Sequence, residues 1–332
     1  MLVCERDGSG TPKPITLDGY RSLVALMDDV ARREPPAKPR QPAIPPRETA
    51  KGIAFVEFAS RGKEAEELGK LFQALGFAKV ARHRNKAVDL YRQGDIRFIV
   101  NQETEGHAGR TWTVRGISVC DIGLNVGSAS ETSRRAAALG DEPFEQPIGD
   151  GEIAIPAIRG LSGSVLHFID PSTEDVWDRE FVSLDERAEG AGLTSVDHLA
   201  QTMSYGDMLS WTLFYTTLFE MRKSPMVDVI DPDGVVRSQV VESPDHKLRV
   251  TLNGAETHRT LAGSFLAETF GSQVQHIALA TDDIFATAEH LAKLGFEVLP
   301  IPGNYYRDLA ARFSLFAFAR ATGSDGGGKH PP

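Results

Sequence analysis

Short runs of alternating apolar and polar residues, typical of strands, are separated along most of the chain by stretches with helical periodicity. Residues 53–59 predict a strand, and residues 63–75 predict a helix that ends before Gly76. Three further short strands are predicted at 78–84, 87–92 and 96–100. The same order begins again near residues 114, 195 and 274, which indicates one β-α-β-β-β module used four times.

The later copies predict the same elements at a less regular spacing. The second copy has a strand at 114–122 and a helix near 129–139, and the third has a helix near 207–219. The fourth has a helix at 283–294 and a strand at 296–300, followed only by a short helix near 304–309. The remaining strands of the second and third copies are expected at 164–170, 227–230, 236–242 and 247–252. We therefore predict an α+β fold of two open barrels, each built from a pair of modules, with the fourth module truncated.

Two segments precede the modules. Residues 18–33 predict an amphipathic helix, which cannot bury its own apolar face and should belong to an upstream domain or pack on the next one. Six prolines between residues 35 and 46 predict a semi-rigid linker. The predicted regions are an upstream helix (1–33), a proline-rich linker (34–50), a first module pair (52–170), a second module pair (195–313) and a divergent tail (314–332).

The composition narrows the cellular setting. The chain has 332 residues, a formal net charge of -10 and two cysteines, Cys4 and Cys120. The negative charge disfavours nucleic acids and anionic membranes as partners, and so few cysteines fit a reducing compartment. No apolar run approaches the roughly 20 residues that span a bilayer, and the first residues do not resemble a signal peptide. We expect a cytoplasmic protein.

Two histidines lie in similar strand-like settings. His198 and His276 each occur within a β-branched, apolar run near the start of the third and fourth copies. Neutral imidazoles held on strands are suitable ligands for a divalent metal. A hydrogen-bonded core histidine is the alternative at each position, but it is less favoured for two histidines at the same point of a repeated module. We therefore predict that His198 and His276 bind a metal.

A catalytic site of this kind needs a third ligand, usually a carboxylate, which the last strands of the fourth copy should supply. No acidic residue follows Asp308 in a strand-like run, and Asp325 lies in a glycine-rich tail. Phe55 and Gly116 match the two histidines in the first two copies, so we expect no metal in the front half. The other histidines are expected to be structural: His83, His107, His167, His246, His258, His290 and His330.

Four segments carry a resemblance to a known family: SVDHLAQTM, VVRSQVVESPDHKLRVTLNGA, AGSFLAETFGSQVQHIALATDDI and GNYYRDLAARF. Over residues 52–313 the chain resembles the 4-hydroxyphenylpyruvate dioxygenases of the vicinal oxygen chelate superfamily. The resemblance implies that His198 and His276 bind a divalent metal, Fe(II) first, with Mg and Mn left open. In that family an α-keto acid chelates the iron, and the iron activates O₂. The resemblance also implies a substrate pocket lined by Ser238, Asn253 and Gln275.

The chain resembles most closely a group of bacterial fusion proteins in which a sugar-phosphate-isomerase-like barrel acts as 3-dehydroshikimate dehydratase. This implies a setting in aromatic (quinate–shikimate) catabolism, with residues 1–33 as a remnant of the barrel and the dehydration chemistry in the barrel, which this chain does not contain. Two features depart from the dioxygenases. Residues 252–255 read Leu-Asn-Gly-Ala where the family has a Leu-Asn-Glu-Pro-like stretch. The family's glutamate ligand lies in a C-terminal segment missing here, and the resemblance ends after Phe313, as in a truncated or frame-shifted chain.

Three functions stay open at this point. The first is a metal-binding, dioxygenase-like domain of a bifunctional dehydratase, inactive alone because it lacks the third ligand and the barrel. The second is an Fe(II) dioxygenase acting on an aromatic α-keto acid, and the third is a non-catalytic scaffold or dimerisation module. In the first two cases the expected partner is a small aromatic or hydroaromatic acid. Unpaired strand edges in the incomplete fourth module also predict a homo-oligomer.

Overall fold

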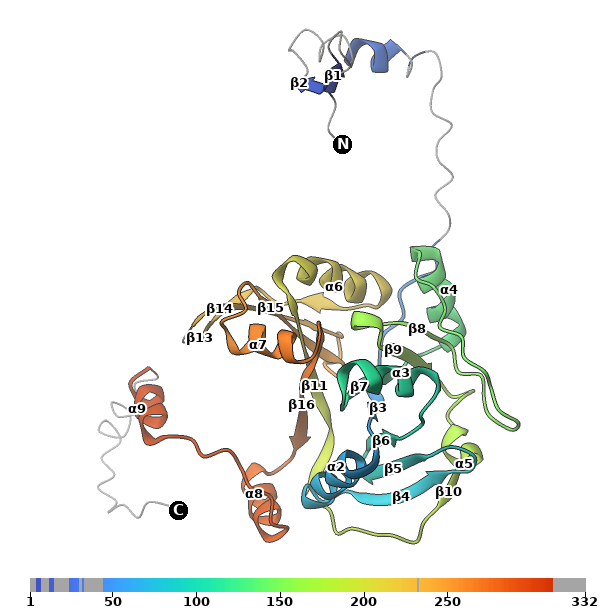
Figure 1. The fold of residues 1–332 in the computed structure, drawn as a ribbon, viewed down its shortest axis with the longest axis vertical. Coiled ribbons are helices and arrows are strands. Elements are labelled where there is room, and N and C mark those ends of the chain that lie inside the picture. Colours follow the sequence, from blue (N-terminus) through green and yellow to red (C-terminus); the bar gives the residue numbers. More distant parts are fainter. Residues whose placement is uncertain are drawn as a thin grey trace.

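The computed structural model describes residues 4–6, 12–14, 24–29, 32, 44–231 and 233–312. Most of them form two module pairs that lie side by side (Figure 1). We call residues 53–183 the front pair and residues 193–312 the back pair, after their order in the sequence. Before these, β1 (Cys4–Arg6) and β2 (Pro12–Pro14) form a two-stranded antiparallel sheet. Residues 24–29 are helical, and Val24 and Met27 of the predicted apolar stripe are exposed. Most of the predicted linker and the tail from residue 314 lie outside the described residues.

The front pair forms an eight-stranded sheet in the order β10-β4-β5-β6-β3-β7-β9-β8. Its first module consists of β3 (Ile53–Ala59), α2 (Gly62–Ala74), β4 (Ala78–His83), β5 (Val88–Gln93) and β6 (Ile96–Asn101). Its second consists of β7 (Ser118–Asn125), α4 (Ala129–Leu139), β8 (Ala157–Arg159), β9 (Val165–Ile169) and β10 (Phe181–Ser183). Two further helices lie in the connections, α3 (Gly106–Arg115) and α5 (Val176–Glu180).

The back pair forms a six-stranded sheet in the order β12-β14-β15-β11-β16, with β13 paired to β14. Its strands are β11 (Leu193–Ser204), β12 (Arg222–Lys223), β13 (Val227–Asp231), β14 (Gly234–Glu242), β15 (Arg249–Ala255) and β16 (Gln273–Thr281). Its helices are α6 (Tyr205–Leu218), α7 (Leu261–Glu268), α8 (Ile284–Lys293) and α9 (Gly303–Arg312). In the portion of the chain described, β16 is an edge strand.

The modules of each pair meet in the same way, through an antiparallel pairing of their first strands, β3 with β7 and β11 with β16. In each sheet the described strands run from one edge to the other without closing into a barrel. The predicted α+β fold of two tandem module pairs is thereby confirmed, with each predicted open barrel found as one open sheet. The residues described contain no helix that is both long and apolar enough to cross a membrane.

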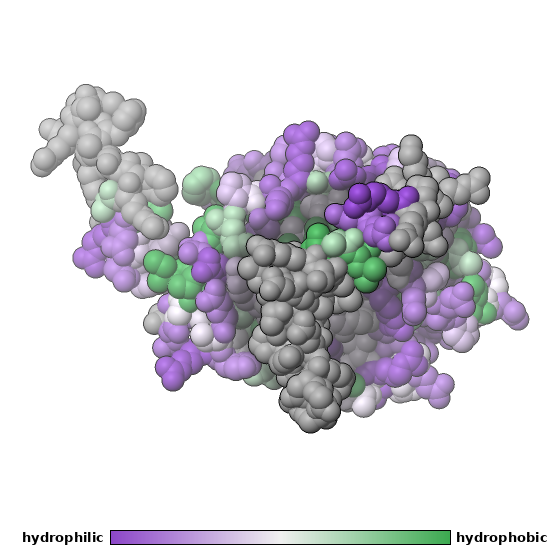
Figure 2. Space-filling model, turned by 90° about the horizontal axis from the view of Figure 1, so that it is seen from above, coloured by the Kyte–Doolittle hydropathy of each residue, from purple (hydrophilic) through white to green (hydrophobic). Residues whose placement is uncertain are grey.

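One hydrophobic core joins the two pairs. Val56 and Phe98 of the front sheet belong to the same buried cluster as Leu199 and Met203 of the back sheet. Because side chains alternate along a strand, the neighbours Phe55 and Ile99 lie in a second cluster on the opposite face of the front sheet. The functional groups described below lie on the faces of the two sheets that point away from this shared core. Exposed hydrophobic residues form separate areas on a mostly hydrophilic surface (Figure 2).

Two of the expected strand positions are wrong. Residues 114 and 115 belong to helix α3, where Trp112 donates a hydrogen bond from Nε1 to Glu64 (2.7 Å) and packs under Arg61. These tertiary contacts outweigh the strand preference of its β-branched residues. Residues 296–300 are not a strand, and the Phe296 amide instead bonds to Leu291 at the end of α8. The predicted short helix near 304–309 is confirmed as α9.

Candidate functional site

The structure brings the two predicted metal ligands together. His198 on β11 is the cross-strand partner of Ala278, and His276 on β16 is the partner of Ala200, so the two histidines are diagonal neighbours. Their Nε2 atoms lie 3.3 Å apart, and their ring centroids lie 5.4 Å apart. Such a separation suits either a hydrogen bond between the rings or two nitrogen ligands about 2.1 Å from one metal ion, at an angle of roughly 100°.

The groups around the histidine pair favour metal ligation. Asp197 Oδ2 lies 2.7 Å from His198 Nδ1, and Arg249 holds the same carboxylate at 3.1 Å. The Nδ1–H group of His198 therefore donates to Asp197, which leaves the Nε2 lone pair directed at His276. Partial burial, together with the neighbouring His198 ring, lowers the pKa of His276. A lower pKa favours the neutral imidazole, which is the form that binds metals.

Three polar residues predicted to line a substrate pocket lie on strands of this sheet. Ser238 on β14 pairs with Asn253 on β15, which in turn pairs with Thr202 on β11. Directly paired residues point to the same face of a sheet. Gln275 Oε1 accepts a hydrogen bond from the Thr202 hydroxyl at 2.7 Å, so its amide group remains available as a donor. Within the described ranges, no group of three or more His, Cys, Asp or Glu side chains is suited to hold a metal ion.

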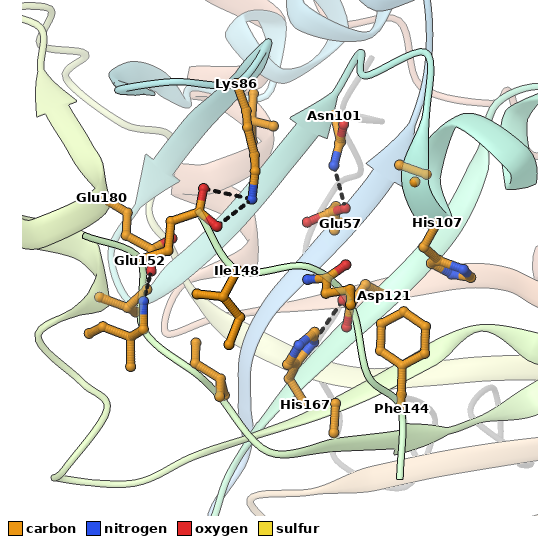
Figure 3. A pocket seen from close by; sticks show the side chains of 18 of the residues that line it. Glu57, Lys86, Asn101, His107, Asp121, Phe144, Ile148, Glu152, His167 and Glu180 are labelled. Atoms are coloured by element: carbon orange, nitrogen blue, oxygen red, sulfur yellow. Dashed lines mark hydrogen bonds and ion pairs between the residues drawn. The ribbon is translucent and has the colours of Figure 1, made fainter. Parts of the chain in front are cut away.

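A large cavity lies in the front pair, away from the histidine pair. Its volume is about 870 Å³, within the usual range of ligand sites. It opens on the face of the front sheet that carries Phe55, opposite the shared core. Glu57 on β3, Asp121 on β7 and His167 on β9 lie together at its floor, with Phe144 and Ile148 of the loop after α4 beside them (Figure 3).

The floor of this cavity is an interacting group of titratable side chains. Glu57 and Asp121 are direct cross-strand partners, and Asp121 Oδ2 lies 2.7 Å from His167 Nδ1. Burial, and then repulsion by Asp121, raise the pKa of Glu57 to about 7, although Asn101 donates a hydrogen bond to it at 2.9 Å. Burial lowers the pKa of His167, but the charge and hydrogen bond of Asp121, together with the charges of Glu57 and Glu180, outweigh burial and raise this pKa.

Another side of the cavity is formed by side chains that bond to one another and to the backbone, among them His83, Lys86 and Glu180. His83 Nδ1 accepts bonds from two backbone amides, so its Nε2–H donates to Glu180, 3.3 Å away. Lys86 Nζ lies 2.7 Å from Glu152, and Glu180 also accepts a bond from the Ile153 amide. These contacts tie residues 144–156, the loop that forms one side of the cavity, to the strands of the sheet (Figure 3).

The sequence models of two families match the chain, one over the front pair and one over the back pair. The one described as "Hydroxyphenylpyruvate dioxygenase, HPPD, N-terminal" matches residues 46–182, and "Glyoxalase/Bleomycin resistance protein/Dioxygenase superfamily" matches residues 195–326. A 4-hydroxyphenylpyruvate dioxygenase from Pseudomonas sp. (strain P.J. 874) is 34% identical over 266 residues, covering 78% of this chain and 73% of that protein. The chain belongs to the 4-hydroxyphenylpyruvate dioxygenase family. The second match extends past Phe313, where the sequence had indicated that the resemblance ends.

Two longer family relatives are also similar to the chain. A 3-dehydroshikimate dehydratase from Pseudomonas aeruginosa is 38% identical over 306 residues, which cover 90% of this chain and 48% of that protein. A solved structure described as a "xylose isomerase-like TIM barrel/4-hydroxyphenylpyruvate dioxygenase fusion protein" has a TM-score of 0.70 and 34% identity, covering 89% of this chain and 48% of its own. The chain thus spans about half the length of these two relatives.

The registers of the first strands in this dioxygenase-family chain correct one predicted match between the front and back pairs. Val56 pairs with Ile122 in the front sheet as Leu199 pairs with Ile277 in the back sheet. Counting along the strands from these pairs, Phe55 matches His198 as expected, but Asp121 and not Gly116 matches His276. The expected match was wrong because α3 shifts the start of the strand to Ser118.

Sequence reasoning also missed the cavity floor. The signals were present: Glu57 interrupts an apolar strand, and Val119–Leu124 has the same apolar pattern as Val274–Leu279 with Asp121 at the place of His276. Three of the histidines expected to be structural, His83, His107 and His167, line this one cavity. Their convergence depends on strand pairing between distant segments, which no local pattern reveals.

Replacing Glu57 with glutamine should flatten the pH dependence of stability. The pKa of Glu57 rises from its ordinary value of 4.5 to about 7 on folding, so its contribution is complete below 4.5 and is lost as the pH rises to about 7. Between about pH 5 and pH 8, the free energy of unfolding should therefore fall by roughly 1–3 kcal/mol less in Glu57→Gln than in the wild type. Urea unfolding at both pH values measures this difference. Glu66→Gln, on the exposed side of α2, should follow the wild type, and equal slopes for all three proteins would contradict the prediction.

Proposed function

We propose that the chain is the metal-binding, 4-hydroxyphenylpyruvate dioxygenase-like part of a 3-dehydroshikimate dehydratase fusion. The 38% identity to a dehydratase and the 34% identity to a barrel–dioxygenase fusion support the fusion context. One observation carries the metal site, namely the 3.3 Å between the Nε2 atoms of His198 and His276 on sister strands. The family relationship makes Fe(II) the first candidate metal, with Mg and Mn as alternatives.

The roles of the surrounding side chains follow from their contacts. Asp197 fixes the tautomer of His198, and Arg249 keeps Asp197 ionised, because its hydrogen bond from His198 and the Arg249 charge lower the pKa of Asp197. This carboxylate–histidine arrangement orients a ligand and strengthens it as a base. The partly exposed His276 then approaches the metal from the edge strand β16. Fe(II) bound here would supply a Lewis acid for a keto acid and a binding position for O₂.

The proposed ligand of this half is a small aromatic or hydroaromatic acid. Ser238 and Asn253 form a polar pair across β14 and β15, and Gln275 extends the same polar face to β16 through Thr202. Hydroxyl and amide groups of this kind orient an oxygen-rich ligand without adding charge. The rest of the ligand would lie over the sheet between this polar row and the histidine pair.

We further propose that this chain does not turn over 4-hydroxyphenylpyruvate on its own. Over residues 44–231 and 233–312 the two histidines have no third protein ligand in reach, whereas catalytic metal sites usually have three. Two ligands should hold the ion several kcal/mol more weakly than three, so the ion would bind without being kept in a reactive arrangement.

The test combines metal binding with turnover on the whole chain. Calorimetric titration with Co²⁺, which neighbours Fe²⁺ in its affinity for nitrogen ligands, should detect one binding site per chain. After anaerobic loading with Fe(II), 4-hydroxyphenylpyruvate should cause no oxygen uptake in an oxygen electrode. Substrate-dependent oxygen uptake would establish a working dioxygenase instead. Absence of any metal binding would overturn the proposal in favour of a scaffold.

A further inference from the structure

The cavity of the front pair contains a buried acceptor that no described side chain satisfies. Asp121 is 6% exposed, and while its Oδ2 pairs with His167, its Oδ1 has no hydrogen-bond partner in the described chain. A buried acceptor of this kind is unfavourable to leave unpaired, because it has lost its hydrogen bonds to water. In Figure 3 Asp121 faces the cavity between Glu57 and His167. A ligand that donates a hydrogen bond there would satisfy the orphaned oxygen.

The charge of the cavity selects the sign of that ligand. Seven carboxylate side chains line it, against two permanently charged cations, Lys86 and Arg110. Lys86 is already paired with Glu152. Arg110, the other cation, is exposed. With seven carboxylates against these two cations, and with Glu57 and Asp121 together at the floor, the lining disfavours acids. This distinguishes the front cavity from the acid-binding face proposed for the back sheet.

The walls indicate an organic body attached to the charged group. Phe55 and Trp177 contact each other edge to face with centroids 5.8 Å apart, and Phe144 packs against His107 at 5.4 Å. Arg97 lies over the Trp177 ring at 5.0 Å and Arg159 over the Phe144 ring at 4.4 Å, but neither arginine lines the cavity, so a ligand would contact the part of each ring that the arginine leaves free. Aromatic rings beside carboxylates are typical of sites for organic cations. Across the described ranges no group of three His, Cys, Asp or Glu side chains is arranged to hold a metal ion, and about 870 Å³ far exceeds the volume of an ion.

We propose that the front cavity is a second binding site, for a small organic cation whose ammonium group donates hydrogen bonds to Asp121 and Glu57 and whose ring lies against Phe55, Phe144 and Trp177. The site is built by the front pair, which does not contain His198 and His276, and it is independent of the metal site. At the positions of His198 and His276 the front pair carries Phe55 and Asp121. The same repeat thereby presents an aromatic ring and a carboxylate to the ligand in place of two metal ligands.

Three probes that share an indole ring and differ in charge test this proposal. Tryptamine carries an ammonium group, tryptophol is neutral, and indole-3-acetate is an anion. We expect calorimetry or saturation-transfer NMR on the full chain, at about pH 8 where Glu57 is ionised, to detect tryptamine binding and to detect the other two at least about tenfold more weakly. Equal binding of tryptophol, preferred binding of indole-3-acetate, or no binding of tryptamine at millimolar concentration would each overturn the proposal.

Variants locate the binding. Asp121→Asn and Glu57→Gln should each weaken tryptamine by at least about tenfold, because each removes one charge-assisted hydrogen bond. Asp228→Asn is the matched control, since it removes an exposed carboxylate from β13 of the other sheet and should leave the affinity unchanged. Thermal unfolding of each variant checks that it is folded. If both cavity variants are folded and bind tryptamine as well as the wild type does, the site is not in this cavity.

Discussion

Replacing His276 with alanine is expected to lower the affinity of the chain for Co²⁺ by more than about a hundredfold. The Nε2 atoms of His198 and His276 lie 3.3 Å apart, close enough for both to bind one ion. The variant leaves one imidazole on β11, and a single neutral nitrogen competes poorly with water for a divalent ion. The loss should exceed the 10- to 100-fold that removal of an outer-shell partner usually causes. Calorimetric titration of both proteins with Co²⁺ measures the ratio.

Two further variants calibrate this result. Asp197→Asn keeps both imidazoles but weakens the carboxylate that orients His198, so it should lose about 10- to 100-fold in affinity, less than His276→Ala. His290→Ala removes an exposed histidine from α8 and should bind Co²⁺ like the wild type. If His276→Ala retained wild-type affinity while folded, the histidine pair would be a hydrogen-bonded pair and not a metal site.

The Phe98→Ala variant should lose about 3–5 kcal/mol of unfolding free energy, the largest stability effect that we expect. Phe98 on β6 is 3% exposed and lies at the centre of an aromatic group. Its ring centroid is 4.9 Å from those of Phe72 and Phe77 and 5.6 Å from that of Phe58. Truncation removes these contacts and leaves a cavity that the surrounding β-sheet cannot fill by moving. Guanidinium unfolding followed by circular dichroism measures the loss.

A conservative variant and a surface variant bound this effect. Phe98→Leu keeps most of the buried volume and should lose clearly less than Phe98→Ala. Phe285→Ala, at a position 81% exposed on α8, should change the unfolding free energy by less than about 0.5 kcal/mol. A loss below about 1 kcal/mol for Phe98→Ala would mean that the core at this point tolerates a cavity.

The sequence predicted most of the architecture because its signals are local. The strand at 53–59 and the helix at 129–139 are found with these bounds, since each has a clear periodicity and an end signal. Ser128 begins the helix by accepting a hydrogen bond from the Glu131 amide, and Gly140 ends it in the left-handed conformation. The repeat also predicted that His198 and His276 occupy sister strands, and their proximity follows from the pairing of those strands.

What the sequence did not predict depends on contacts between distant segments. Helix α3 is stabilised by Trp112 against Glu64 and Arg61, which lie about fifty residues away in the chain. The floor of the front cavity joins Glu57, Asp121 and His167 from three strands, and each alone resembles an ordinary polar residue. Only the strand register shows that they share a face. A search of paired repeats for polar residues at equivalent positions would have found Asp121.

The single core between the front and back sheets limits how the protein can be dissected. Phe98 and Val56 on one side and Leu199 and Met203 on the other are buried in one cluster, so cutting the chain near residue 185 would expose an apolar face on each piece. Neither fragment should be soluble or folded by itself, and each site must be studied by point substitution in the whole chain. The same core packs against the front sheet that carries the cavity and the back sheet that carries the histidine pair, so neither sheet can shift without disturbing the packing of the other.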